Sequence, residues 1–311
     1  MATREILVSH SYKQFLLNHT QGQRLIIDSG SNSFFGIDSH LLEKELNILT
    51  INLADNAGYP LQSKLRRIEK YSHQGDIVLL PLEWQYYSYE AIPDIFTNNL
   101  LGSLHYYHQS TPVQDIKQIW NTPFSSFMYD VNHYRKEFKN NNRNLKQHIE
   151  RFNHQERGDF IQEDFVLEFE EASKVTPCDE YVLGNALKNG FTLSSTFKEN
   201  LKLIQQLQNQ GIHIVLTWPV VVGKDCYSLK NTPMIKGFTK LIKKTLNEHN
   251  ILILGDPYES RFSPEFILNS YYHINAKARD MRTRRLINHL KNPISYSWFN
   301  QTKAISYDLD I

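Results

Sequence analysis

The chain has 311 residues, of which 41% are hydrophobic and 22% are charged. This balance is typical of a globular protein with a substantial core, and the length allows one large domain or two modest ones. The formal net charge of +1 at pH 7 gives no bulk electrostatic reason to bind nucleic acid or an anionic membrane. No apolar run approaches the roughly 20 residues that cross a bilayer, and the N-terminal residues do not form a secretory signal.

The most informative stretch lies near the N-terminus. A short apolar run, Leu25 to Ile27, ends in the hexapeptide Asp-Ser-Gly-Ser-Asn-Ser (28–33), and an amphipathic segment begins at Asp38. This pattern predicts a strand that enters a helix through a tight turn. Such a turn can hold a serine hydroxyl at the carboxyl end of a sheet, near backbone N–H groups that stabilise an oxyanion. The alternative is that the serines only cap a helix.

Two further strands are predicted in the first ninety residues. Residues 48–53 lead to Gly58, where the backbone could approach a ligand closely. Residues 76–81 precede Trp84, the first of a cluster of aromatic residues. Rings beyond the carboxyl end of a strand either stack on a sugar or fill the core, and both readings stay open.

The alternation of strands and helices is interrupted once. Residues 91–185 are rich in Asn, Gln, His, Tyr and Phe, and they are interpreted as an inserted, mostly helical or irregular subdomain. The alternation then returns, with strands expected at 212–217 and 251–254 and helices before each of them. The sequence therefore predicts an α/β domain made of residues 1–90 and 186–311, with a mainly parallel sheet in a three-layer α/β/α sandwich.

The C-terminal part places His273 just ahead of a predicted helix. The basic residues Arg282, Arg284 and Arg285 are interpreted as the solvated face of that helix. Asp256 follows the strand 251–254 and precedes a proline, which is typical of a turn residue.

The cysteines and histidines predict no metal site. Cys178 and Cys226 fit either one disulfide in an extracytoplasmic protein or two free thiols in a cytosolic one. The 13 histidines show no convincing zinc-ligand spacing, and no Gly-rich phosphate loop is present. We therefore expect no metal and no organic cofactor.

Together, the serine turn, the glycine turn and the late histidine resemble the SGNH (GDSL-like) family of serine esterases and acyltransferases. The resemblance covers roughly residues 22–90 and 190–292. The pattern Gly-Ser-Asn-Ser-x-x-Gly-Ile-Asp, with a late Tyr-His-x-Asn and an Arg-Thr, looks most like envelope polysaccharide-associated members. It implies Ser31 as the nucleophile, His273 as the general base and the Gly58 N–H as part of the oxyanion hole.

The chain departs from the family pattern in two places. The Gly-x-Asn-Asp block is missing, so Gln85 is the side-chain amide donor expected there, whereas Glu83 can only accept while ionised. Asn32 and Trp84 complete the expected oxyanion and substrate-binding set. The family's triad Asp lies three residues before the His, where this chain has Ser270, with Asn269 one residue further back.

Because the family's triad Asp is missing, three alternatives for the catalytic acid remain. A Ser31–His273 dyad works with a neutral orienter, or the acid comes from elsewhere, for which Asp256 is the candidate, or the site is inactive.

The resemblance implies an acyl esterase or O-acyltransferase that moves an O-acetyl group on a carbohydrate, namely a cell-surface polysaccharide. A transferase would also need an acyl donor or a membrane protein that supplies it, and no nucleic acid partner is expected. The alternative is a catalytically inactive SGNH-fold module for binding or assembly in polysaccharide biosynthesis or export. The implied location is the periplasm or cell envelope, with an N-terminal anchor absent from the sequence; taken as complete, the chain would be cytoplasmic.

Overall fold

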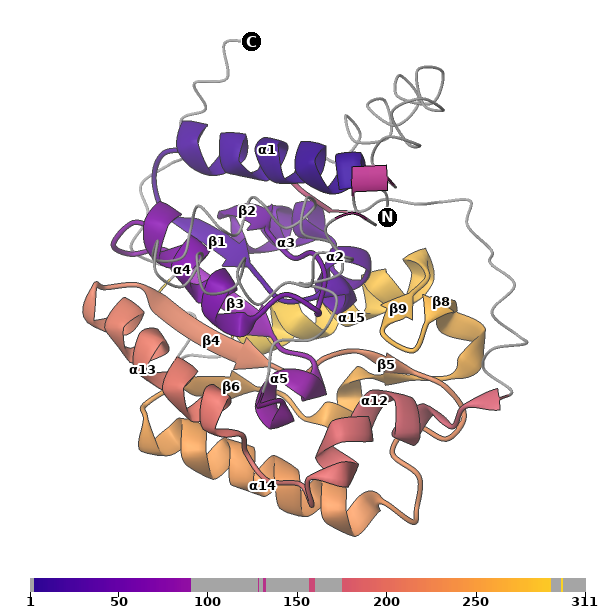
Figure 1. Cartoon of the computed structure of the whole chain (residues 1–311). Coiled ribbons are helices and arrows are strands. Elements are labelled where there is room, and N and C mark those ends of the chain that lie inside the picture. Colours follow the sequence, from indigo (N-terminus) through magenta and orange to yellow (C-terminus); the bar gives the residue numbers. More distant parts are fainter. Residues whose placement is uncertain are drawn as a thin grey trace.

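The computed structural model describes residues 3–90, 128, 131–132, 157–159, 175–291 and 298. A parallel five-stranded sheet forms its centre (Figure 1). Its strands, in spatial order, are β2 (Leu49–Asn52), β1 (Arg24–Ile27), β3 (Ile77–Pro81), β4 (His213–Thr217) and β6 (Leu252–Leu254). The five strands predicted from the sequence are confirmed, and so is their parallel orientation.

Helices cover both faces of this sheet. They are α3 (Ser39–Leu46), α4 (Leu61–Tyr71), α13 (Ser195–Asn209), α14 (Thr232–Glu248) and α15 (Ala276–Leu290). Successive strand residues point to opposite faces. Ile26 and Val78 accordingly belong to a core cluster with α4, α13 and α14, whereas Leu25 and Ile77 pack with α3 and α15. This arrangement is compatible with the expected three-layer α/β/α fold.

The strand order contains a topological switch point between β1 and β3. From β1 the chain continues to β2 on one side and to β3 on the other, so the direction of winding reverses between β1 and β3. Ligands of open α/β sheets bind beyond the carboxyl ends of the strands at such a switch point. Two short helices begin there: α2 (Ser31–Gly36) follows β1, and α5 (Trp84–Ser88) follows β3.

The C-terminal part of the chain adds two pairs of short strands and two 3₁₀ helices to the central sheet. β5 (Val221–Val222) pairs with β7 (Arg261–Phe262), and β8 (Ile267–Ser270) forms an antiparallel hairpin with β9 (His273–Ile274). The 3₁₀ helices η1 (Pro257–Ser260) and η2 (Pro264–Phe266) lie between β6 and this hairpin. The hairpin packs against α2, and so brings a late part of the chain to the turn after β1.

The N-terminal helix α1 (Thr3–His19) lies beside the edge strand β2 (Figure 1). Most of the predicted insertion, residues 91–185, falls outside the described residues. The helix α12 (Cys178–Lys188) begins within that range and packs against α5.

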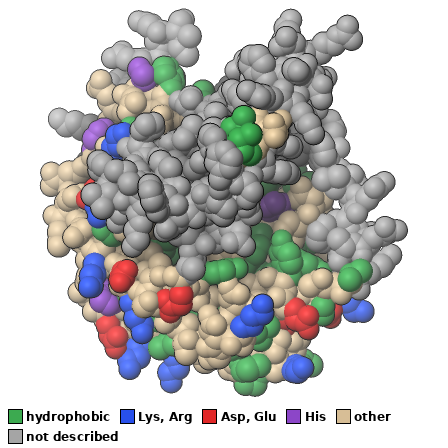
Figure 2. Space-filling view, in the orientation of Figure 1, with side chains coloured by type: hydrophobic (Ala, Val, Ile, Leu, Met, Phe, Trp, Pro, Cys, Tyr) green, Lys and Arg blue, Asp and Glu red, His purple; other side chains and the backbone are tan. Residues whose placement is uncertain are grey.

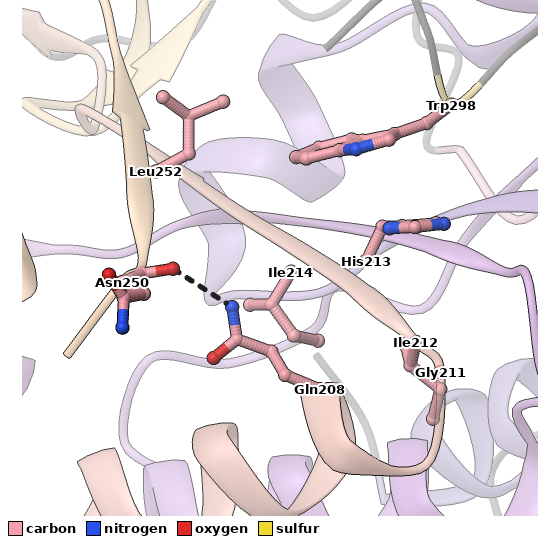
Figure 3. A pocket seen from close by; sticks show the side chains of 8 residues that line it. All are labelled: Gln208, Gly211, Ile212, His213, Ile214, Asn250, Leu252 and Trp298. Carbon is pink, nitrogen blue, oxygen red and sulfur yellow. Dashed lines mark hydrogen bonds between the residues drawn. The ribbon is translucent and has the colours of Figure 1, made fainter. Parts of the chain in front are cut away.

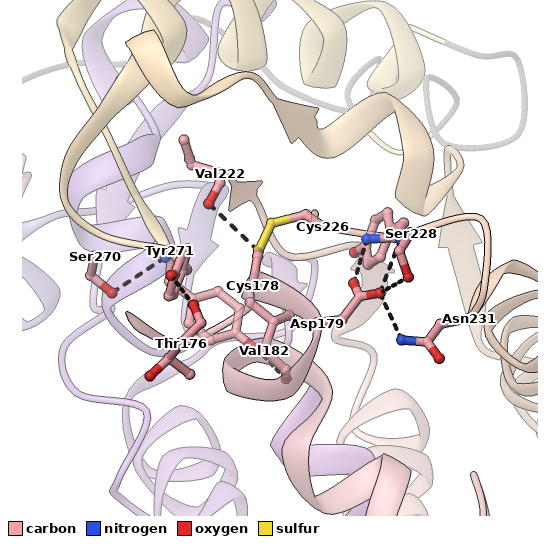
Figure 4. The surroundings of a disulfide bond; sticks show 12 residues. Thr176, Cys178, Asp179, Val182, Val222, Cys226, Ser228, Asn231, Ser270 and Tyr271 are labelled. Atoms are coloured by element: carbon pink, nitrogen blue, oxygen red, sulfur yellow. Dashed lines mark hydrogen bonds between the residues drawn. A yellow bond between two sulfur atoms is a disulfide. The ribbon is translucent and has the colours of Figure 1, made fainter. Parts of the chain in front are cut away.

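Cys178 and Cys226 form a disulfide that joins the start of α12 to the loop after β5 (Figure 4). The sequence left open whether these cysteines form one disulfide or two free thiols, and the structure has the disulfide. Next to it, the buried carboxylate of Asp179 accepts hydrogen bonds from the backbone amides of Tyr227 and Ser228. The disulfide and this carboxylate therefore fasten the same loop to α12.

Positive and negative side chains are interspersed around α13 and α14 in the view of Figure 2, as the near-zero net charge leads one to expect. Among the helices in the described part of the chain, none combines the length and the apolar character needed to span a membrane.

Candidate functional site

The three serines of the turn after β1 have different surroundings. Ser29 and Ser33 are fully buried, and the Ser29 hydroxyl donates to the Ser33 hydroxyl at 2.6 Å. Ser31 is partly exposed. Neither its amide nor its hydroxyl forms a hydrogen bond with any residue that the structure describes. Ser31 is therefore the serine of this turn that a substrate could reach.

Gly30 is required by close packing rather than by its backbone angle. Its φ of −84° suits any residue. A Cβ at this position, however, would lie 2.3 Å from the Ala57 Cβ and 2.3 Å from Glu83 Oε1. The glycine thus lets the loop after β2 and the segment after β3 meet directly against the serine turn.

Glu83 is fully buried, and its carboxylate holds the backbone on both sides of Ser31. It accepts from the Gly30 amide at 3.0 Å and from the Asn32 amide at 3.2 Å. Burial raises the pKa of this carboxyl above its usual range. Two of the N–H groups expected to stabilise an oxyanion are therefore occupied, and the Ser31 amide lies between them.

The other two predicted oxyanion donors are also engaged. The Gly58 amide donates to Asn56 Oδ1 at 2.7 Å. The Gln85 side-chain amide donates to the Ala57 carbonyl, and its second N–H has no hydrogen-bond partner among the described residues. The structure thus places Gln85 beside the loop that touches Gly30, while the Gly58 donor would have to leave Asn56 before it could serve a ligand.

His273 packs against the helix that begins with Ser31. Its ring centroid lies 4.2 Å from that of Phe35, and Phe35 follows Ser31 by four residues, which puts both on one face of α2. The Nδ1 atom of His273 bonds to Asn269 Oδ1, which is one of the two neutral orienters predicted. An amide oxygen accepts, so Nδ1 carries the proton and the Nε2 lone pair is left for a substrate proton.

Burial lowers the pKa of His273 to about 3, so its imidazole is neutral at physiological pH. A neutral imidazole is the form that a general base requires. No hydrogen bond joins Ser31 to His273 among the described residues.

The other two candidates for the acid or orienter bond to other groups, although Ser270 is the cross-strand partner of His273 in the β8–β9 hairpin. Asp256 caps η1, where its carboxylate accepts from the Tyr258 amide at 2.9 Å, and no described interaction joins it to His273. The Ser270 hydroxyl accepts from the Tyr272 amide at 3.4 Å. Asp256 is thus the turn residue that its place before Pro257 predicts.

Two predicted substrate-binding residues lie in the core. Trp84 is 1% exposed, and its indole N–H donates to the Tyr227 hydroxyl at 2.9 Å. Its ring packs against the rings of Trp218 and Phe238, and its burial leaves no surface for a sugar to stack on. Asn32 is fully buried, and its side-chain Nδ2 donates to the Pro81 carbonyl at 2.8 Å, which ties the turn to the end of β3.

The interpretation of Arg282 as a solvated residue is wrong. Its side chain is 2% exposed and donates to both the carbonyl and the side-chain oxygen of Asn32, each at 2.6 Å. Burial lowers its pKa to about 9, against the attraction of Glu83. The neighbouring Thr283 hydroxyl accepts from the Asp38 amide at 3.0 Å. The Arg-Thr pair of α15 therefore fastens both ends of the serine-turn region.

Sequence reasoning missed a buried ion cluster beneath this turn, formed by Asp28, Asp55, Lys64 and Arg67. Arg67 binds Asp28 at 2.8 Å and Asp55 at 3.0 Å, and Lys64 pairs with Asp55. Lys64 also donates to the Ser29 carbonyl at 2.8 Å. A signal was present, because Lys64 and Arg67 fall on the same face of α4 as its buried apolar residues.

A separate cavity of about 140 Å³ lies at the amino-terminal ends of the strands, where β4 and β6 begin (Figure 3). The indole of Trp298 stacks on His213 beside it, with 4.9 Å between ring centroids. The cavity is thus remote from the carboxyl ends of the strands. In the described ranges, no group of three or more His, Cys, Asp or Glu residues could hold a metal ion.

Comparison of the chain with models of protein families, with curated proteins and with solved structures finds no match.

Proposed function

We propose that the protein is a serine acyl-transfer enzyme, either an ester hydrolase or an O-acyltransferase, with Ser31 as nucleophile and His273 as general base. The observation that carries this proposal is the setting of His273. A neutral imidazole, tied at Nδ1 by Asn269, packs on the face of α2 that begins with Ser31, at the switch point of a parallel sheet.

The chemistry follows from these groups. The Ser31 hydroxyl attacks an acyl carbonyl while His273 Nε2 takes its proton and later returns it to the leaving group. The Ser31 amide and the free N–H of Gln85 are the donors available to the oxyanion. A catalytic hydrogen bond that is absent without substrate often forms only when substrate binds. Because Asn269 is uncharged, it stabilises the imidazolium less than an aspartate would, so slow turnover of simple esters is expected.

The resemblance to envelope polysaccharide-associated SGNH proteins supports the substrate class, an O-acetyl group on a cell-surface polysaccharide. For a transferase, an acyl donor or a membrane protein that supplies it belongs to the same proposal. A location in the cell envelope is also proposed. The disulfide supports it, because disulfides persist mainly in oxidising compartments.

The second candidate is a binding or assembly module without catalysis. The bonds from Glu83 to the Gly30 and Asn32 amides favour it, because a carboxylate already occupies two donors that an active oxyanion hole could use.

Labelling with a fluorophosphonate, together with hydrolysis of a chromogenic acetyl ester, tests the proposal. The wild-type protein should be labelled and should hydrolyse the ester. Ser31→Ala should abolish both labelling and hydrolysis, and His273→Ala should strongly reduce both. Ser263→Ala is a matched control, because Ser263 is an exposed serine outside the site. Labelling that persists in Ser31→Ala would refute the nucleophile, and a folded but unreactive wild type would favour the binding module.

A further inference from the structure

The peptide unit between Ser29 and Gly30 is bonded at both ends to buried charged side chains. Its carbonyl, on Ser29, accepts from Lys64 Nζ at 2.8 Å and from the Asp55 amide at 3.3 Å. Its N–H, on Gly30, donates to Glu83 Oε2 at 3.0 Å. Lys64 and Glu83 are both fully buried.

These two contacts act together because a trans peptide is rigid. Its C=O and N–H lie in one plane and point in opposite directions. The Lys64 ammonium therefore faces the negative end of the peptide dipole, and the Glu83 carboxylate faces the positive end. Hydrogen bonds to charged groups are about twice as strong as neutral ones. Rotation of this peptide would break both contacts at once, in a place that water does not reach.

The second Glu83 oxygen extends the restraint past Ser31. It accepts from the Asn32 amide at 3.2 Å, so a single carboxylate holds the amides on either side of the serine. Neither buried charge is isolated. Lys64 pairs with Asp55 and lies 3.7 Å from Asp28, and Glu83 is close enough to Arg282 to affect its ionisation.

We propose that Lys64 and Glu83 are positioning residues, which fix the orientation of the Ser29–Gly30 peptide and thereby the place of the Ser31 hydroxyl. The restraint on this peptide exists whether or not the protein is an enzyme. The consequence for Ser31 rests on the proposed function. Misplacement of a reacting group by about 1 Å can lower a rate about 100-fold, so the reactivity of Ser31 should depend on this pair.

The test compares Glu83→Gln with Asp179→Asn. Asp179 is also a buried carboxylate that accepts from two backbone amides, but it lies beside the disulfide (Figure 4), and its hydrogen-bond partners are Tyr227, Ser228 and Asn231 rather than residues of the serine turn. Both variants lose one negative charge and one acceptor oxygen. Two quantities are measured in folded protein: the rate of fluorophosphonate labelling at Ser31, and the amide hydrogen exchange of Gly30 and Asn32 by NMR.

We expect Glu83→Gln to label roughly 10- to 100-fold more slowly and to exchange faster at Gly30 and Asn32, while Asp179→Asn changes neither. Wild-type labelling and exchange at these amides in Glu83→Gln, or equal losses in both variants, would overturn the proposal. If wild type itself does not label, the proposed function fails, and the exchange measurement still decides the positioning role.

Wild-type exchange gives a second measurement that does not depend on whether the variants fold. The Gly30 and Asn32 amides should exchange more slowly than the Ser31 amide between them, which has no partner among the described residues. Equal exchange at all three amides would contradict the restraint by Glu83.

Discussion

Arg282 and Asn32 are 250 positions apart in the chain and are joined by two hydrogen bonds of 2.6 Å. The guanidinium binds both the main-chain and the side-chain oxygen of Asn32, and the Asn32 side-chain Nδ2 in turn donates to the Pro81 carbonyl at the end of β3. The last described helix therefore holds the turn that carries Ser31, although the two are nearly at opposite ends of the sequence.

Replacement of this arginine should cost stability. Arg282→Met would leave two buried oxygens of Asn32 without their charged donor, and we expect the free energy of unfolding to fall by about 3 kcal/mol. Urea denaturation measures it. Arg284→Met is the control, because Arg284 is exposed and its ion pair within the described part of the chain is with Asp280 on its own helix, so a change within about 0.5 kcal/mol is expected. Equal effects of the two variants would contradict the bonds to Asn32.

A methyl group at Gly30 should be poorly tolerated. It would lie 2.3 Å from the Ala57 Cβ and 2.3 Å from Glu83 Oε1, so Gly30→Ala should destabilise by about 1–3 kcal/mol and slow Ser31 labelling. Gly184→Ala, in α12, meets no atom within 4 Å, and it should stabilise by up to about 1 kcal/mol. Thermal unfolding and labelling of both variants check this. Wild-type labelling in Gly30→Ala would show that the turn accommodates a Cβ at this position without displacing Ser31.

An acid placed opposite His273 Nδ1 should increase the hydrolysis rate. The structure puts Asn269, rather than Ser270, against this atom, so Asn269→Asp supplies the charge that stabilises an imidazolium. We expect acetyl-ester hydrolysis to rise about tenfold or more. Ser270→Asp serves as the comparison and should raise the rate less. A larger gain from Ser270→Asp would mean that Asn269 is not the orienter.

His273 should make stability depend on pH in a defined window. Its pKa is lowered to about 3 by burial, against 6.5 for an unperturbed histidine. Between these values the unfolded chain binds a proton that the folded protein does not, so the free energy of unfolding falls as the pH drops from about 6.5 toward 3. His273→Gln should show a smaller fall than wild type between pH 7 and about 5 in urea denaturation. Identical pH dependence of the two proteins would contradict a buried neutral imidazole.

Reduction of the disulfide should destabilise the fold. Cys178 and Cys226 are separated by 48 positions, and a cross-link over such a loop contributes roughly 4 kcal/mol in the chain-entropy treatment. We expect a shift of that order in urea denaturation with a reductant, and no further shift by reductant in the double variant Cys178→Ser, Cys226→Ser. Two free thiols titrated in unreduced, unfolded wild type would show that the bond does not form.

The sheet could be predicted from the sequence because its strands are continuous apolar runs between turn residues, and burial on both faces produces that pattern. The turn that carries Ser31 could be predicted for a related reason, since a run of small residues directly after the first apolar run is a local feature, whereas the choice of Ser31 within it came from the resemblance to the SGNH family. The hydrogen bonds that Asn269 accepts from His273 and that Asp256 accepts from the Tyr258 amide are also local, and Asn269, His273 and Asp256 are all predicted site residues.

The buried charges could not be predicted in this way. Arg282, Lys64 and Glu83 each find their partners tens to hundreds of positions away. A charged residue on a helix is usually solvated, so composition and periodicity favour the wrong environment for Arg282. The prediction of Trp84 as a substrate-binding residue was wrong for a different reason. An aromatic residue just beyond a strand fits a ligand site and a core equally well.

The central pairing of β3 with β4 joins residues that are 136 positions apart, as Ile77 and His213 are. During synthesis β1, β2 and β3 emerge first, and β3 then has an open edge until β4 leaves the ribosome. Such long-range parallel pairing is slow to form, and an unpaired apolar edge promotes association with other chains. The sheet that assembles the serine turn therefore closes late, and its folding yield in the cell should depend on how well the edge of β3 is protected in the interval.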